Sequence, residues 1–220
     1  MYRYTTMLQR NQITEFKSIA TALILCLACI QLSLQAAPDS APLLEESFNS
    51  ELGKEWFWGL GTWTSKDGVL RVFESGPRRH GPVKVRRLPL KDAKLDFEFR
   101  LEGKASFAGI IFNGDQDRGH LFHLVMAKDQ IRLLAHPKKG ETVELFKQGC
   151  ELKTGEWNHV TLRFKEDTFE ASVAGVSVHA ANPCIAEQKQ TFGLGGESGG
   201  PSGESAGALE FRKLTVLQTP

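Results

Sequence analysis

The chain has 220 residues, of which 41% are hydrophobic, and it carries 27 basic and 26 acidic side chains. This length is sufficient for a domain with a sizeable buried core. The near-balance of charge argues against a nucleic-acid-binding protein, which usually shows a large basic excess.

The N-terminal segment has the pattern of a secretory signal peptide. A basic region containing Arg3, Arg10 and Lys17 precedes the apolar run 21–34, and small residues follow that run. The run is shorter than the roughly 20 apolar residues that span a bilayer, and its flanks are typical of a cleaved signal. We therefore expect residues 1–37 to be removed, leaving a secreted, periplasmic or cell-surface protein without a membrane span.

The remainder is expected to form a linker over residues 38–43 and one folded domain over residues 44–218. Residues 1–37 hold three basic and one acidic side chain, so 24 basic and 25 acidic side chains remain after them. This balance again favours a partner other than nucleic acid.

Alternation of apolar and polar residues predicts strands along the rest of the chain. Asp67-Gly68 stands between two such runs and is a strong hairpin signal. A second hairpin is expected at residues 165–167, and residues 93–102 alternate throughout. Further runs cover residues 107–113, 120–126, 130–136, 142–147, 157–165, 168–174 and 207–217. With about a dozen short strands and no helix longer than two turns, the chain is predicted to be an all-β, antiparallel two-sheet sandwich or jelly roll.

Two segments differ from this alternation. Residues 193–207 contain seven glycines among serines, which predicts a flexible loop inserted at the rim rather than a strand. Residues 76–89 hold five basic side chains and His80 between prolines. They are expected to form either a charged edge strand that opposes aggregation or a surface for an acidic polysaccharide.

Motifs in the second half of the chain resemble those of a known fold family. Residues 155–160, GEWNHV, followed by Phe164 and a turn at Ala174-Gly175, are similar to a hairpin of concanavalin A-like lectin/glucanase and laminin G-like sandwiches. Those sandwiches often have Asp-Gly at this turn, so one acid is missing here. The order of motifs over residues 44–113 also resembles the secreted bacterial domains of the 3-keto-disaccharide hydrolase type.

This resemblance covers about residues 44–217. It implies a concanavalin A-like jelly roll whose partner is a polysaccharide or oligosaccharide. By analogy, the glycan would lie on the concave sheet or at its rim.

The acidic residues do not form the pattern of a retaining glucanase. Such an enzyme needs two carboxyl groups about 5 Å apart, and the chain has no E-x-D-x-x-E run. Asp96 and Glu98 share a predicted strand face with Lys94 and Arg100. This face is either an ion-paired surface or a glycan-facing row, with Glu98 as an acid or base and Arg100 as a ligand-binding residue.

The stretch 112–126, FNGDQDRGHLFHLVM, gathers several polar residues between apolar runs. Asn113, Asp115 and Asp117 alternate as calcium ligands often do, but Arg118 occupies the glycine position that an EF-hand requires. Asp115 and Asp117 are expected either to bind calcium in a looser loop, with Asn113 contacting a ligand, or to serve only the turn. No other cofactor is indicated.

Two histidines in this stretch are candidates for acid–base catalysis. His120 and His123 point to opposite faces of an extended strand, so they cannot share a ligand unless the strand bulges. Each is either a packing residue or, where its face lines a cleft, a general acid or base with a pKa near neutral. No informative spacing is found for His80, His136, His159 and His179.

The tryptophans suggest a second kind of contact with a sugar. Trp56 and Trp58 are expected to share one strand face, opposite Phe57. At least one tryptophan should lie in the core, and an exposed one would offer a flat face to a ligand.

Cys150 and Cys184 are the two cysteines left after the signal peptide. In an exported chain such a pair favours a disulfide, here closing a loop of about 34 residues. The alternative is two free thiols.

Three functions fit these observations. The first is an exported carbohydrate-binding domain, and the second is a glycan-cleaving hydrolase or lyase of the 3-keto-disaccharide type. The third is a non-catalytic surface interaction module without a sugar ligand. The missing carboxylate pair disfavours ordinary retaining glycosidase chemistry, although a lyase mechanism does not require that pair.

Overall fold

The computed structural model describes residues 41–76, 81–200 and 206–219. The predicted signal peptide, most of the predicted linker and His80 lie outside these residues. No helix in the described part of the chain is long and apolar enough to cross a bilayer.

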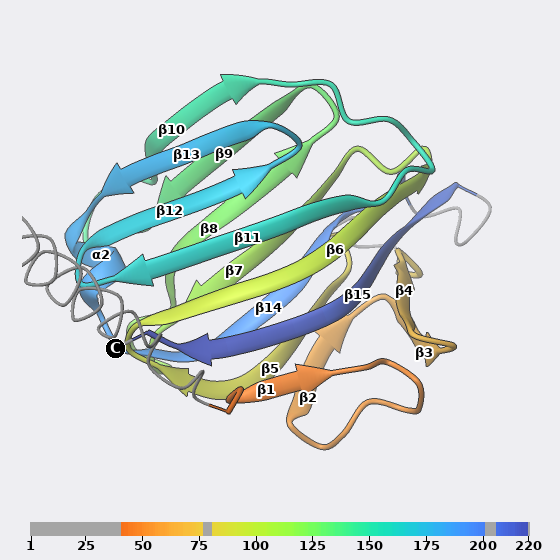
Figure 1. Cartoon of the computed structure of the whole chain (residues 1–220), viewed down its shortest axis with the longest axis horizontal. Helices are drawn as coiled ribbons and strands as arrows, with labels where there is room; N and C mark the ends of the chain where they lie inside the picture. The colour runs from red at the N-terminus through yellow and green to blue at the C-terminus, as the bar shows by residue number, and fades with distance from the viewer. Residues whose placement is uncertain (1–40, 77–80, 201–205, 220) are drawn as a thin grey trace, which may run out of the picture. The chain divides into compact units, whose positions relative to one another are not determined.

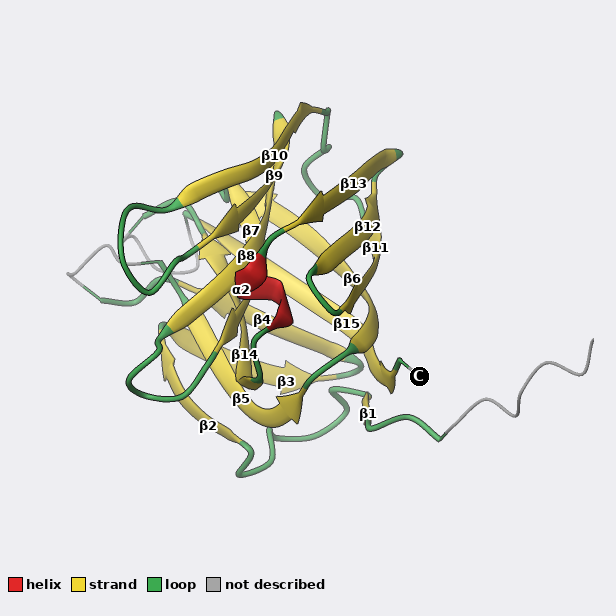
Figure 2. Ribbon diagram, turned by 90° about the vertical axis from the view of Figure 1, so that its left-hand side faces the viewer, coloured by secondary structure: helices red, strands yellow, loops and turns green. Residues whose placement is uncertain are grey.

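The described residues form two antiparallel sheets packed face to face (Figure 1). The strands are β1 Leu44–Glu46, β2 Trp56–Leu60, β3 Thr62–Lys66, β4 Val69–Phe73, β5 Val83–Leu90, β6 Ala93–Gly103, β7 Phe107–Asn113, β8 His120–Ala127, β9 Gln130–Ala135, β10 Val143–Gly149, β11 Asn158–Lys165, β12 Thr168–Val173, β13 Val176–Ala181, β14 Lys189–Glu197 and β15 Gly207–Gln218. A short helix, α2, covers Pro183–Ala186 at one end of the sandwich (Figure 2).

Each sheet mixes strands from distant parts of the sequence. The eight-stranded sheet has the order β13-β12-β11-β6-β15-β4-β3, with β1 also paired to β15. The seven-stranded sheet has the order β10-β9-β8-β7-β14-β5-β2. This architecture confirms the predicted all-β, concanavalin A-like sandwich.

Local sequence accounts for the two predicted hairpins. Asp67 and Gly68 both have positive φ, 53° and 82°, as the turn between β3 and β4 requires. Glu166-Asp167 joins β11 to β12 in the same two-residue manner. Both hairpin predictions are therefore confirmed.

The core lies between the sheets and follows the predicted alternation. Along β6, Leu95, Phe97 and Phe99 are at most 1% exposed, while their neighbours face solvent. From the other sheet, the ring of Phe112 stacks on Phe122 with centroids 4.8 Å apart. The removal of this apolar surface from water is the main source of stability in such a fold.

The glycine-rich segment is not wholly a loop, which corrects the prediction for residues 193–207. Strand β14 continues to Glu197 and pairs on both sides, with β5 and with β7. A Cβ on Gly195 would lie 2.4 Å from the carbonyl oxygen of Pro82. Glycine is present here because a neighbouring backbone approaches closely, which composition alone does not reveal. Residues 201–205 lie outside the described part.

The basic segment does not form an edge strand, so that prediction is also wrong. Strand β5 lies between β14 and β2, and its backbone is paired on both sides. Instead, β2 occupies this edge of the seven-stranded sheet.

The predicted disulfide is not formed: Cys150 and Cys184 are both free. The Cys150 Sγ atom lies 3.7 Å from the carbonyl oxygen of Ala127, at one end of β8. Cys184 lies near Arg118, which precedes the other end of that strand. A strand of this length spans more than about 20 Å, whereas a disulfide joins Cα atoms within about 7 Å. The even number of cysteines therefore led to a wrong prediction of a disulfide.

Candidate functional site

A pocket of about 370 Å³ opens on the outer face of the seven-stranded sheet. Its floor is made by β7, β14 and β5, where Gly109, Gly193 and Gly195 expose backbone instead of side chains. Val83 and Val85 of β5 add apolar surface. The result is a hollow on an otherwise continuous sheet face, bordered by an aromatic side chain at one end and histidines at the other.

Trp58 forms the aromatic end of this pocket. Its side chain is 48% exposed, whereas Trp56 is 4% exposed and packs edge-on against Phe192 in the core. The expectation that the two tryptophans share a face is wrong, because β2 bulges between them where it pairs with β5. The expectation of one tryptophan in the core is confirmed.

A second bulge brings the two predicted histidines together. Phe112 pairs with Phe122, but Asn113 pairs with His120, so Leu121 is an extra residue in β8. This extra residue turns His120 to the face that carries His123, and both line the pocket. The expectation of opposite faces held only for a strand without a bulge.

His136, which the sequence did not single out, completes the histidine cluster. Its ring is stacked on that of His123, with centroids 4.9 Å apart and planes at 12°. The His123 Nδ1 and His136 Nε2 atoms lie 2.7 Å apart, and the His136 Nδ1 atom lies 3.1 Å from the Thr142 hydroxyl. These contacts form a chain that leads from the pocket to the start of β10.

Asn113 fixes the orientation of the third histidine. Its side-chain NH₂ donates to the Thr191 hydroxyl at 3.0 Å, so its Oδ1 atom is an acceptor. That oxygen lies 2.7 Å from the His120 Nδ1 atom, which therefore carries a proton and donates it. Asn113 and His120 thus stand side by side on the pocket wall.

The surroundings favour the neutral forms of His123 and His136. Burial lowers the pKa of His123 to about 4, and the neighbouring His136, His120 and Arg132 add to the effect. Burial, followed by the charges of His120 and Arg118, also holds the pKa of His136 below its usual value. Each of these neutral rings has one nitrogen with a lone pair that can accept a hydrogen bond or a proton.

Arg118 braces the loops beside this cluster. It donates two hydrogen bonds to the Glu187 carboxylate, at 2.6 and 2.8 Å, and these raise its pKa. It also donates to the backbone carbonyls of His120 and His136, at 2.8 and 2.9 Å. One guanidinium therefore ties the start of β8 to the end of β9 and to α2.

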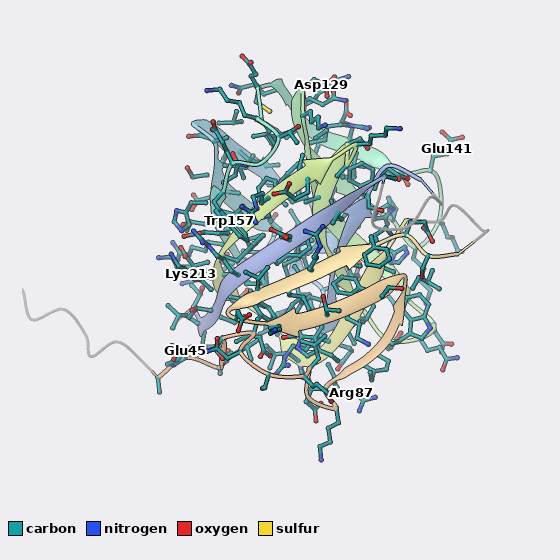
Figure 3. The ribbon with its side chains drawn as sticks, turned by 90° about the vertical axis from the view of Figure 1, so that its right-hand side faces the viewer. Glu45, Arg87, Asp129, Glu141, Trp157 and Lys213 are labelled. Carbon is teal, nitrogen blue, oxygen red and sulfur yellow. The ribbon has the colours of Figure 1, made fainter. Side chains whose placement is uncertain are left out.

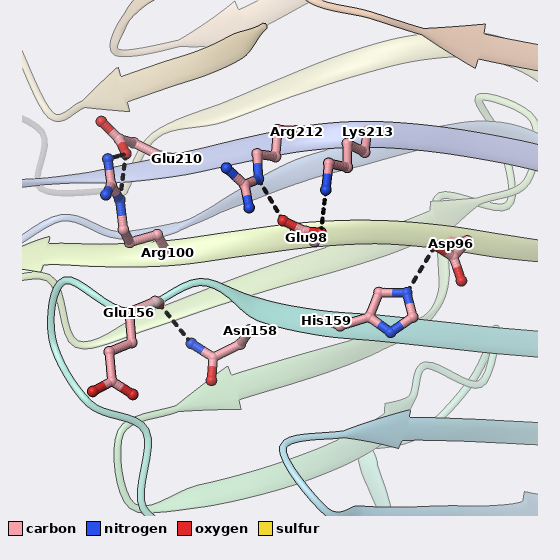
Figure 4. A network of polar contacts seen from close by, with 9 residues as sticks. All are labelled: Asp96, Glu98, Arg100, Glu156, Asn158, His159, Glu210, Arg212 and Lys213. Atoms are coloured by element: carbon pink, nitrogen blue, oxygen red, sulfur yellow. Dashed lines mark hydrogen bonds and ion pairs between the residues drawn. The ribbon is translucent and has the colours of Figure 1, made fainter.

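The predicted catalytic Glu98 lies on the other sheet, away from His120 and His123. It is on the outer face of β6, where Arg212 and Lys213 of β15 bind both of its oxygens (Figure 4). Partial burial alone would raise the pKa of Glu98, but these hydrogen bonds outweigh it and lower the pKa. A carboxylate held ionised by two cations is a poor proton donor, so Glu98 fits the ion-paired interpretation better than the catalytic one.

Arg100 belongs to the same network. Its Nε atom donates to Glu210 at 2.7 Å, and its guanidinium lies 4.7 Å from the centre of the Trp157 ring. Arg212 lies over that ring as well, at 4.0 Å. Figure 3 shows Trp157 and Lys213 on the same flank of the sandwich. Arg100 is thus saturated by partners within the chain.

Asp115 and Asp117 lie in the turn between β7 and β8. The Asp115 carboxylate accepts a hydrogen bond of 2.8 Å from the Arg118 backbone, which is a common role of aspartate in turns. Within residues 41–76, 81–200 and 206–219, no three His, Cys, Asp or Glu side chains are placed to hold a metal ion. The loop geometry is explained by the turn itself.

Comparison with known proteins identifies the family. Residues 45–217 match the 3-keto-alpha-glucoside-1,2-lyase-like domain, so the chain belongs to this family. The match runs from β1 into β15 and confirms the resemblance seen in the sequence motifs. A search of curated protein sequences found no match.

Solved structures with the same fold include several that are named for carbohydrates. The carbohydrate-binding module CBM66 of Bacillus subtilis has a TM-score of 0.54 at 11% identity, covering 72% of this chain and 92% of that one. The VIP36 exoplasmic/lumenal domain, in its Ca²⁺/Man₃GlcNAc-bound form, has a TM-score of 0.57 at 11% identity, with 80% and 90% covered. The Crh5 transglycosylase has a TM-score of 0.57 at 13% identity, with 82% and 85% covered. At these identities the similarity establishes the fold.

Proposed function

We propose that this chain is an exported saccharide-binding domain whose ligand lies in the pocket on the seven-stranded sheet. The observation that carries the proposal is the composition of that pocket. An exposed Trp58 offers a flat apolar face, the glycine floor leaves room for a ring, and Asn113 and the histidines supply polar contacts. Small-molecule sites typically combine apolar walls with a few such polar groups, in volumes of roughly 300–1,000 Å³.

The comparisons support this proposal from outside the chain. The family is named for glucosides, CBM66 is a carbohydrate-binding module, and VIP36 was solved with a mannose-containing glycan. Export to the periplasm, cell surface or medium is part of the proposal and rests on the sequence of residues 1–37.

A binding experiment with two matched variants tests the proposal. Trp58→Ala and Phe57→Ala each remove an aromatic ring that is about half exposed, but only Trp58 lines the pocket. We expect calorimetric titration with a panel of neutral oligosaccharides to identify a ligand, and Trp58→Ala to weaken it about tenfold or more. Phe57→Ala should bind as the unchanged protein does. Equal affinity of all three proteins would contradict the placement of the ligand.

A second candidate is elimination chemistry on a 3-keto saccharide, favoured by the histidine pair in the pocket and by the family name. A carbonyl at C3 acidifies the hydrogen on C2. A base removes this proton, the C–H electron pair forms the C1–C2 double bond, and the C1–O bond breaks. An acid then protonates the departing oxygen, so the reaction needs no carboxylate pair.

His123 is placed to be the base in this second candidate. Its Nδ1 atom is engaged with His136, so Nε2 is the nitrogen left for the pocket. When His136 donates to Thr142 and accepts from His123, the His123 Nε2 atom carries a lone pair. Taking up a proton at Nε2 can shift one proton from His123 Nδ1 to His136 Nε2 and another from His136 Nδ1 to the exposed Thr142 hydroxyl. That hydroxyl releases its own proton to water, so no charge remains in the buried site.

Isotope exchange separates this candidate from binding alone. Incubation of a 3-keto glucoside in deuterated water should incorporate deuterium at C2 or release the aglycone, both visible by mass spectrometry. We expect His123→Gln to abolish catalysed exchange, and His159→Gln, on the exposed face of β11, to leave it unchanged. Saccharide binding without exchange would support the first proposal and refute the second.

A further inference from the structure

A second groove, of about 670 Å³, crosses the outer face of the eight-stranded sheet. Strands β15, β6, β11, β12 and β13 lie side by side there, in front of the other sheet in Figure 1. One row of paired residues runs across all five strands. It consists of Leu217, Lys94, Arg163, Glu170 and His179.

Two cations face each other at the centre of this row. Lys94 of β6 and Arg163 of β11 are directly paired across the strands, and both are exposed. Side chains at such positions have Cβ atoms about 5 Å apart, and like charges there destabilise the sheet. Neither side chain forms a hydrogen bond or ion pair with any residue that the structure describes.

Two acids lie near this cation pair, and within the described residues neither forms an ion pair with it. Glu170 is opposite Arg163, but its carboxylate lies 3.7 Å from the His179 ring. Asp96, two residues from Lys94, accepts from His159 and from the Thr161 hydroxyl, both at 2.8 Å. Glu170 offsets part of the positive charge, but two cations and one acid line the groove, so its net charge stays positive and favours an external anion.

Hydroxyl groups continue the groove beside the cations. Ser172 and Ser177 are paired across β12 and β13, and Thr161 lies beside them on β11. Leu217 provides apolar surface at the other end of the row. This groove combines hydroxyl groups, a small apolar surface and two positive charges. Such a lining suits a saccharide chain in which sugar rings carry anionic groups at intervals better than it suits a uniformly charged polymer. The overall near-neutral charge points the same way.

We propose that this groove binds an acidic saccharide through a carboxylate or sulfate group held between Lys94 and Arg163. Arginine presents a fork of donors that matches either anion, and lysine adds a point charge. This site is separate from the pocket with the histidines, because the two lie on the outer faces of opposite sheets. One domain could then hold two saccharide segments at once.

Titration calorimetry at low salt tests the proposal with three trisaccharides. Trigalacturonate carries carboxylates, a sulfated trisaccharide carries sulfates, and maltotriose is neutral. We expect at least one acidic ligand to bind, with the two differing in strength, and maltotriose not to bind at this groove. Lys94→Gln and Arg163→Gln should each weaken the acidic ligand about tenfold. Raising the salt concentration should also weaken it.

Lys147→Gln is the matched control, because Lys147 is an exposed lysine on β10 of the other sheet. It removes the same charge and should leave binding unchanged, as should Trp58→Ala, which tests the other pocket. The proposal would be overturned if Lys147→Gln weakened the acidic ligand as much as Lys94→Gln does. It would also be overturned if a short DNA strand of the same charge bound as tightly as the acidic saccharide, because general charge attraction would then explain the effect.

A stability measurement provides an independent readout. Because Lys94 and Arg163 repel each other, Lys94→Gln should raise the midpoint of thermal unfolding slightly in the absence of ligand. A clear fall in the midpoint would mean that Lys94 serves the fold, which would contradict the proposed role.

Discussion

Replacement of His123 by glutamine tests the electrostatics of the candidate site. Burial, reinforced by His136, His120 and Arg132, lowers the pKa of His123 to about 4 in the folded chain, against 6.5 for an unperturbed histidine. The gap of about 2.5 between these pKa values corresponds to roughly 3 kcal/mol at about 1.4 kcal/mol per unit. This free energy is the largest penalty that protonation of His123 can impose on the fold.

The direction of the effect follows from which state binds the proton. Between pH 6.5 and about 4, His123 is protonated in the unfolded chain but neutral in the folded one. Its contribution is therefore fully present above pH 6.5 and is lost as the pH falls through this window. The free energy of unfolding of the unchanged protein should fall by up to roughly 3 kcal/mol more than that of His123→Gln.

Urea unfolding at a series of pH values from 7 to 4 measures this difference. The comparison uses the slope with pH, so a general loss of stability in the variant does not affect it. Phe57→Ala, which removes no titratable group, should keep the slope of the unchanged protein. Parallel curves for His123→Gln and the unchanged protein would refute the account of a buried neutral histidine.

Three further predictions concern the fold around the pocket. Gly195→Ala should lower the free energy of unfolding by about 1–3 kcal/mol in denaturant, because its Cβ would lie 2.4 Å from a backbone oxygen. Gly53→Ala, with nothing within 4 Å of its Cβ, should leave the free energy of unfolding nearly unchanged. Equal losses in the two variants would contradict this explanation. Arg118→Gln should lower the free energy of unfolding by roughly 2–3 kcal/mol and weaken saccharide binding in calorimetry. The reason is that it removes the hydrogen bonds that hold the backbone at His120 and His136. Unchanged stability would contradict that role. Alkylation of the unfolded, unreduced protein should modify both Cys150 and Cys184, as detected by mass spectrometry. A product in which neither cysteine is modified would show that the disulfide exists.

Much of the fold could be predicted because its signals are local. The alternation along β6 places Leu95, Phe97 and Phe99 in the core without reference to any other strand. The Asp67-Gly68 turn likewise fixes its hairpin through the backbone preferences of two residues. Such features need no knowledge of which strands become neighbours.

The site was harder to predict because two single-residue bulges decide its geometry. The extra residues Phe57 and Leu121 rotate Trp58 and His120 onto the pocket face, and a period-2 pattern cannot register such an insertion. Bulges depend on the pairing of strands, so alternation alone gave wrong faces for the tryptophans and histidines.

His136 was missed for a related reason, although a signal for it existed. It lies next to His123 because β8 pairs with β9, with Met126 opposite Ile131. Counting outward from the short connection between these strands would have placed His136 opposite Leu121 and therefore near His123. The spacing of residues within one strand could not reveal the contact between His123 and His136, because it joins two strands.

The central claim, that a saccharide occupies the pocket on the seven-stranded sheet, is tested most directly by mapping the bound ligand with NMR. Amide chemical shifts would be followed during titration with a neutral saccharide selected by calorimetry. We predict that the largest changes fall on the floor glycines Gly109, Gly193 and Gly195 and at Trp58, while Lys94 and Arg163 on the opposite sheet remain unchanged. Changes confined to the eight-stranded sheet, or spread evenly over both sheets, would contradict the account.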